Sequence, residues 1–250
     1  MQVMHARCAG LDVHKKKVVA CVLITKGDGT VESHRARFLT MTPDLLALSD
    51  WLKNWEVTHV AMESTGVYWW PVYQLLQGQF TLLVANAHQI KRVPGRKTDV
   101  SDAEWLADLL RHGLIAPSFV PNQEQRQLRE LTRHRNNVIG RRTQCVNELQ
   151  RTLEGTNIKL SSVATDITGV SAMEMLKHIL SGEKDPNVLA ELARGVLRKK
   201  LPELRRALQG VVHPHQQLIL SQLLADINNC EEQEQALNEE IAKGLAAEQE

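Results

Sequence analysis

Four acidic residues stand at the ends of segments that the sequence predicts to be strands or helices. Asp12 lies near the end of one apolar run typical of a β-strand, and Glu63 closes a second apolar run. Asp99 and Asp102 are three residues apart, where a helix is expected to begin. Carboxylates at adjacent strand ends and on a nearby helical turn can converge on hard divalent cations, which prefer oxygen ligands. The pattern therefore predicts phosphodiester chemistry on nucleic acid.

Each acid taken alone has a simpler interpretation. A strand aspartate such as Asp12, or a terminal Glu63, more often faces solvent than binds a metal. Thr98 or Asp99 could cap the helix, and the helix dipole favours Asp102 in its first turn. The joint arrangement favours a metal site, because two cations ~3.5–4 Å apart stabilise both oxygens of an in-line phosphoryl displacement. Without cations or neighbouring Lys and Arg side chains, four clustered carboxylates would repel one another.

Two basic segments could hold phosphate groups near these acids. The first, directly before Asp99, supplies Lys91, Arg92, Arg96 and Lys97. The second, residues 126–151, contains arginine and no lysine, which favours bidentate phosphate recognition and makes RNA a plausible partner. Its candidate contacts are Arg126, Arg129, Arg133, Arg141 and Arg142. Both segments could instead be a solvated loop and a solvated helix face.

The charge balance of the whole chain hides this segregation. The formal net charge is only +1, from 30 Lys and Arg against 29 Asp and Glu, but the residues from Asp226 onward are rich in Glu. Four scattered cysteines without a C-x-x-C pair argue against zinc and disulfides. No apolar run approaches the ~20 residues that span a bilayer, and no signal peptide is recognisable, so we expect a cytoplasmic protein.

The order of predicted elements indicates an α/β fold. Residues 7–39 predict three strands and residues 43–55 a helix with Leu45, Leu46, Leu48, Trp51 and Leu52 on its apolar face. The strand ending at Glu63, a helix near 72–77 and a strand over 80–85 follow. This βββαβαβ order, followed by helices, is the one expected of an RNase H-like domain.

Long helices are predicted for the second half of the chain. Residues 122–153 contain no proline and one glycine, and residues 215–245 have a similar apolar pattern, so we expect an antiparallel pair or an intermolecular coiled coil. Short helical segments are expected between them. The predicted organisation is a metal-binding domain (1–120), an Arg-rich first helical arm (121–155), a helical insertion (156–212) and a second arm (213–250).

Three motifs together resemble a known family. Gly10-Leu11-Asp12-Val13-His14-Lys15, Met62-Glu63-Ser64-Thr65-Gly66-Val67-Tyr68 and Gly95-Arg96-Lys97-Thr98-Asp99-Val100-Ser101-Asp102-Ala103 resemble the DEDD-type insertion-sequence transposases, bridge-RNA-guided recombinases with a RuvC-like N-terminal domain. The resemblance implies that Asp12, Glu63, Asp99 and Asp102 are catalytic and bind Mg²⁺, with Mn²⁺ as a substitute and two ions expected. It also implies a guide (bridge) RNA, donor and target DNA, and a dimer or tetramer built through the helical arms in the bacterial cytoplasm, near the nucleoid.

The same resemblance implies a C-terminal domain whose serine attacks DNA, and we expect no equivalent within these 250 residues. The chain would then hold the metal half of a composite site without its nucleophile, and alone it would be incomplete for recombination. Two alternatives stay open. One is a RuvC-like nuclease that uses water with the same four acids, and the other is a non-catalytic module for RNA binding and oligomerisation.

Overall fold

The computed structural model describes residues 2–64, 66–86, 90, 93 and 101–247. The chain divides into two compact units, Met1–Val120 and Pro121–Glu250, and each is described by itself. No helix in the described ranges is long and apolar enough to cross a membrane.

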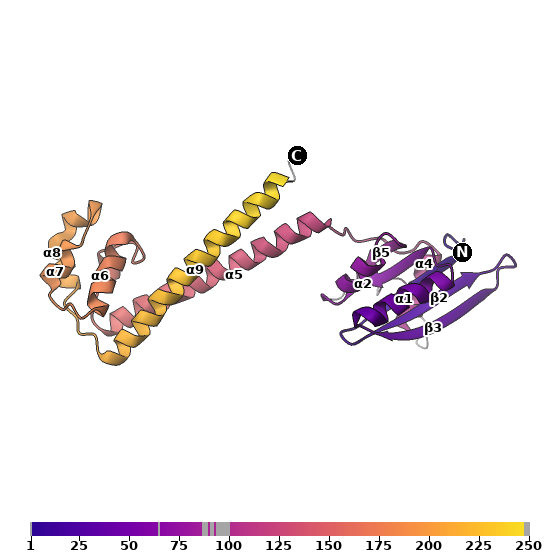
Figure 1. Cartoon of the computed structure of the whole chain (residues 1–250), viewed down its shortest axis with the longest axis horizontal. Coiled ribbons are helices and arrows are strands. Elements are labelled where there is room, and N and C mark those ends of the chain that lie inside the picture. The colour runs from indigo at the N-terminus through magenta and orange to yellow at the C-terminus, as the bar shows by residue number, and fades with distance from the viewer. Residues whose placement is uncertain (1, 65, 87–89, 91–92, 94–100, 248–250) are drawn as a thin grey trace. The chain divides into compact units, whose positions relative to one another are not determined.

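A five-stranded mixed sheet is the centre of the first unit (Figure 1). Its strands are β1 (Arg7–Val13), β2 (Lys17–Thr25), β3 (Val31–Leu39), β4 (His59–Glu63) and β5 (Thr81–Ala85). They lie in the order β3-β2-β1-β4-β5, with β2 antiparallel to β1 and β3, and β4 parallel to β1 and β5. The helices described beside the sheet include α1 (Thr42–Asn54), α2 (Trp69–Leu76) and α4 (Asp102–Arg111). This topology is that of an RNase H-like fold and confirms the expected fold class.

The two faces of the sheet are covered by different helices, because successive strand residues point to opposite sides. Leu11 and Met62 pack into the core that includes apolar residues of α1 and α2. Cys8 and Ala61 pack on the other face, against α4. The prediction that Leu46 lies on the apolar face of α1 is wrong, because Leu46 is 51% exposed. Only residues about one turn apart face the sheet, and those are buried.

The second unit is an antiparallel helix pair with a cluster of short helices at one end (Figure 1). The long helices are α5 (Gln123–Gly155) and α9 (Pro214–Ala247). Between them come η1 (Leu160–Ser162), α6 (Val170–Leu180), α7 (Pro186–Glu191), η2 (Gly195–Lys200) and α8 (Leu201–Ala207). One apolar core joins the short helices to the adjoining ends of α5 and α9, including Leu149, Leu153 and Leu224. The short helices thus depend on the long pair for burial of their apolar faces.

Candidate metal centre

Asp12 and Glu63 occupy matching positions at the carboxyl ends of two neighbouring strands. The parallel register of β1 and β4 pairs Leu11 with Met62, so Asp12 and Glu63 are the next residues on each strand. Parallel strands bring their carboxyl ends to the same edge of a sheet. The register therefore places both acids side by side along the sheet.

Both acids also belong to the face that α4 covers. Strand residues two apart share a face, so Asp12 lies on the side of Gly10 and Cys8, and Glu63 on the side of Ala61. Cys8 and Ala61 are fully buried in the core that α4 completes. Asp12, with a side chain that is 25% exposed, lies beyond this core at the open end of the strand.

A close helix-to-strand contact at Gly10 sets the position of the third acid. A Cβ atom on Gly10 would lie 2.1 Å from the carbonyl oxygen of Ala103 and 2.5 Å from the backbone nitrogen of Ala107. The Sγ of Cys8 donates to the carbonyl oxygen of Ala107 at 3.4 Å, so α4 runs antiparallel to β1. The first residue of α4, Asp102, is therefore at the end of the strand that carries Asp12.

Ser101 caps α4, in place of the expected Thr98 or Asp99. Its Oγ accepts a hydrogen bond from the backbone nitrogen of Glu104 at 3.3 Å. The carboxylate of Glu104 is itself held by an ion pair with Arg35 of β3. The positive end of the helix dipole and its free N–H groups favour anions at this position. The start of α4 is thus suited to Asp102 and to a phosphate group.

His14 is a neighbour of the acids that the sequence did not single out. Its Nε2 lies 3.0 Å from Oδ2 of Asp12, and His14 is the first residue after β1. The available signal was its position two residues after Asp12, directly beyond the end of β1. His14 can orient the Asp12 carboxylate and, when protonated, offset its charge.

The donor chemistry fits a hard divalent cation. Asp12, Glu63 and Asp102 offer only carboxylate oxygens, the ligands that Mg²⁺ and Mn²⁺ prefer. Among the described residues, no group of three or more His, Cys, Asp and Glu side chains is gathered closely enough to hold a metal ion. The fourth predicted acid, Asp99, and the basic candidates Lys91, Arg92, Arg96 and Lys97 lie outside the described residues.

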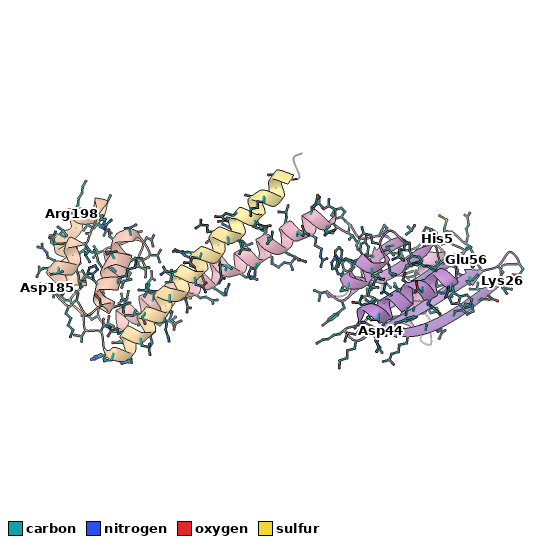
Figure 2. The ribbon with its side chains drawn as sticks, in the orientation of Figure 1. His5, Lys26, Asp44, Glu56, Asp185 and Arg198 are labelled. Carbon is teal, nitrogen blue, oxygen red and sulfur yellow. The ribbon has the colours of Figure 1, made fainter. Side chains whose placement is uncertain are left out.

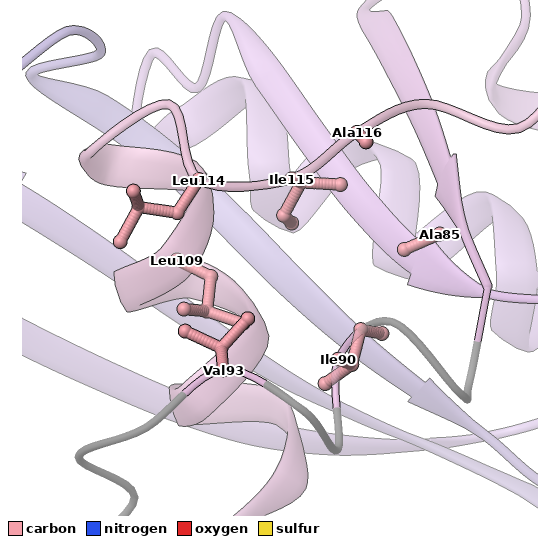
Figure 3. Close-up of a pocket in the computed structure, with 7 residues that line it drawn as sticks. All are labelled: Ala85, Ile90, Val93, Leu109, Leu114, Ile115 and Ala116. Atoms are coloured by element: carbon pink, nitrogen blue, oxygen red, sulfur yellow. The ribbon is translucent and has the colours of Figure 1, made fainter.

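An apolar pocket of about 230 Å³ lies on the same side of the sheet as α4 (Figure 3). It is lined by Ala85, Ile90, Val93, Leu109, Leu114, Ile115 and Ala116. None of these side chains can ligate a cation or donate to a phosphate oxygen. The side chains of this pocket therefore supply no group for the predicted chemistry.

Most of the predicted arginine contacts on α5 have partners inside the chain. Arg141 donates to Oε1 of Gln233 at 2.8 Å, Arg142 donates through Nε to Glu231 at 3.0 Å, and Arg126 pairs with Glu130 at 3.2 Å. Arg135 adds an ion pair with Glu234 at 2.9 Å. Arg129 and Arg133 are exposed, and within the described ranges their side chains have no hydrogen-bond or ion-pair partner. Nucleic-acid binding by the five predicted contacts stays a prediction: Arg126, Arg129, Arg133, Arg141 and Arg142.

Comparisons with solved structures find low similarity to Holliday junction resolvases. RuvC of Thermus thermophilus is 14% identical with a TM-score of 0.32, over 45% of this chain and 99% of RuvC. The same protein in complex with a Holliday junction substrate gives 13% and 0.31 over the same shares. The fowlpox virus Holliday junction resolvase gives 10% and 0.26, over 32% of this chain and 60% of that protein. Comparison with curated proteins gave no match.

A family model gives the assignment. Residues 9–158 match the model of the IS110-type DEDD transposases, described as transposase. The match spans more than half of the 250 residues and includes all four predicted acids. It confirms the resemblance carried by the three motifs. This chain therefore belongs to the IS110-type DEDD transposase family, whose members are DNA-processing enzymes.

Proposed function

We propose that the first unit is the divalent-metal half of a transposase active site. The observation that carries the proposal is the matched placement of Asp12 and Glu63 on parallel strands, with the start of α4 at the same end of the sheet. Asp102 begins that helix, and Asp99, three residues earlier, completes the set of four acids.

The cation expected here is Mg²⁺, with Mn²⁺ as a substitute and two ions for the full set. Bound between these acids and a scissile phosphate, it would stabilise the negative charge on the attacking and leaving oxygens. The residues of the chain have separate tasks. The sheet fixes Asp12 and Glu63 relative to each other, and α4 presents Asp102. His14 keeps the Asp12 carboxylate oriented.

We extend the proposal to DNA recombination guided by RNA. The motif resemblance supports this part, since it implies a guide RNA, donor and target DNA, and a serine nucleophile supplied by a separate domain. Association into a dimer or tetramer through α5 and α9 belongs to the same proposal. In the alternative, a RuvC-like nuclease, water replaces the serine and this chain alone cleaves DNA.

Manganese binding tests the metal half directly. Titration of the protein with Mn²⁺, followed by the electron paramagnetic resonance signal of free Mn²⁺, should show binding that Asp12→Asn and Asp102→Asn each weaken by at least about tenfold. Asp50→Asn is the matched control, because Asp50 is an exposed acid on α1 whose side chain is 76% accessible. Unchanged Mn²⁺ affinity in both site variants would overturn the proposal.

The same variants separate the proposal from the nuclease alternative. The proposal expects no cleavage of duplex or branched DNA by this chain in Mg²⁺, together with Mn²⁺ binding that needs Asp12. Cleavage that is present in the unmodified protein, absent in Asp12→Asn and retained in Asp50→Asn would establish the water-using nuclease instead.

A further inference from the structure

A second concentration of positive charge lies in the short helices of the second unit. Residues 194–206 contain six positively charged side chains and a single carboxylate, Glu203. They are Arg194, Arg198, Lys199, Lys200, Arg205 and Arg206, which we call the basic tip. They come from η2, the residue before it and α8. The net charge of the chain, +1, gives no hint of such a local excess.

The backbone that carries the basic tip is firmly held. Ala193, Leu204 and Leu208 on either side of η2 are buried in the core of the unit, with at most 2% exposure. The backbone nitrogen of Arg194 donates to Oγ of Ser171 at 2.9 Å, which ties the start of η2 to α6. The cations are thus displayed on an ordered surface, so binding would cost little backbone ordering.

Three of the six side chains have partners that fix their position. Glu191 pairs with both Arg198, at 3.4 Å, and Arg205, at 3.1 Å. Lys200 donates through Nζ to the carbonyl oxygen of Val163 at 3.1 Å. One carboxylate shared by two guanidinium groups, and a neutral carbonyl as acceptor, leave most of this positive charge uncompensated.

The other three cations are exposed and without partners. Arg194, Lys199 and Arg206 are exposed, and within the described part of the chain their side chains make no hydrogen bond or ion pair. Figure 2 shows the neighbouring Arg198 at the surface of these short helices. On α5, Arg141 and Arg142 differ, since they donate to residues of α9, whereas Arg129 and Arg133 are also exposed and have no partner among the described residues. The basic tip thus brings three cations without internal partners among the described residues into one short stretch of sequence, beside three more cations.

We propose that the basic tip binds the phosphodiester backbone of a nucleic-acid duplex. The chemistry is recognition of phosphate oxygens by guanidinium and ammonium groups, which gives affinity without base specificity. The inference rests on the proposed function, because a nucleic-acid-processing chain supplies the partner. It assigns a contact to a part of the molecule well separated in sequence from the four acids and needs no metal ion.

A triple substitution tests the proposal with a matched control. The tip variant carries Arg194→Gln, Lys199→Gln and Arg206→Gln. The control carries Arg37→Gln, Lys53→Gln and Lys243→Gln, which remove the same charge from exposed cations of β3, α1 and α9. Fluorescence anisotropy of labelled 20-base-pair RNA and DNA duplexes of one sequence is followed from 50 to 200 mM salt, in EDTA. Circular dichroism checks that both variants are folded.

The tip variant should bind at least about tenfold more weakly, with a salt slope reduced by about 2–3, because each lost phosphate contact releases about one counterion fewer. The control should keep the affinity of the unmodified protein within about twofold. The effect on RNA or on DNA alone would identify which duplex the tip contacts. Equal losses in both variants, no loss in the tip variant, or no binding by the unmodified protein would overturn the proposal. Because EDTA removes metal ions, this assay does not depend on metal binding by the four acids. The Mn²⁺ titration therefore tests the proposed function separately.

Discussion

Replacement of Gly10 by alanine should destabilise the first unit and disturb the start of α4. An added Cβ would lie 2.1 Å from the carbonyl oxygen of Ala103, whereas real Cβ contacts are essentially never below 3.0 Å, so helix and strand must separate by about 0.9 Å. The contacting atoms belong to the backbone of α4, and no side-chain rotation can relieve the clash.

Two opposing effects set the size of the change. Alanine restricts the unfolded chain, which favours folding by about 0.5–1 kcal/mol relative to glycine. Overpacking in a well-packed core costs about 1–3 kcal/mol. The cost is larger, and we expect Gly10→Ala to lower the free energy of unfolding by about 1–2 kcal/mol. With a slope of about 1.5 kcal/mol per M, the urea midpoint falls by roughly 1 M.

Tryptophan fluorescence reports this unit selectively. All five tryptophans of the chain lie in it: Trp51, Trp55, Trp69, Trp70 and Trp105. Gly27→Ala is the matched control, because a Cβ there meets nothing within 4 Å and the residue is exposed. Gly10→Ala should also weaken Mn²⁺ binding, while Gly27→Ala should leave Mn²⁺ binding unchanged and should not lower the urea midpoint. Equal urea midpoints for the two variants would refute the close-contact reasoning.

Two further predictions concern titratable groups of the first unit. Burial, and then the neighbouring charge of His5, lower the pKa of His59 from 6.5, so the folded state resists protonation. The contribution of His59 to the free energy of unfolding should be fully present above about pH 6.5 and should be lost as the pH falls toward the lowered pKa. His59→Gln should therefore reduce the dependence of the urea midpoint on pH between pH 7.5 and 5.5. An unchanged dependence in this variant would contradict the prediction. Burial raises the pKa of the Cys8 thiol to about 12 and also raises the pKa values of Cys21 and Cys145. Cys8 and Cys21 are buried whereas Cys145 is half-buried, so iodoacetamide at pH 8 should label Cys145 before either of them. Mass spectrometry of the native protein checks the order, and labelling of Cys8 as fast as Cys145 would contradict it.

The strand-end acids were accessible to sequence reasoning because their signal is local. Asp12 and Glu63 each close a short apolar run, and strand periodicity then fixes the face on which each lies. The close approach of α4 was not accessible in this way. Nothing near Gly10 in the sequence indicates that Ala103, more than ninety positions later, will press against it. Local capping was also mistaken, since Ser101 takes the role expected of Thr98 or Asp99.

Charge patterns are harder to interpret because a partner can come from the same chain. Residues 126–151 are rich in arginine and the residues from Asp226 onward are rich in glutamate, a segregation that points to an external anionic partner when the segments are considered apart. The fold brings these two segments together, and Arg135 and Arg142 pair with Glu234 and Glu231. Part of the arginine pattern that suggested nucleic-acid binding is therefore explained by ion pairs between α5 and α9.

The basic tip escapes that compensation for a structural reason. The acid-rich part of α9 lies beyond the apolar end that packs against the short helices, where Leu220, Leu223 and Leu224 are buried. Its carboxylates are consequently used along α5, and only Glu191 is shared by Arg198 and Arg205 at the tip. A cluster of cations is a stronger predictor of a phosphate contact once the carboxylates within reach have been assigned. By that criterion, Arg194, Lys199 and Arg206 are better candidates than Arg126, Arg141 and Arg142, whose partners lie within the chain.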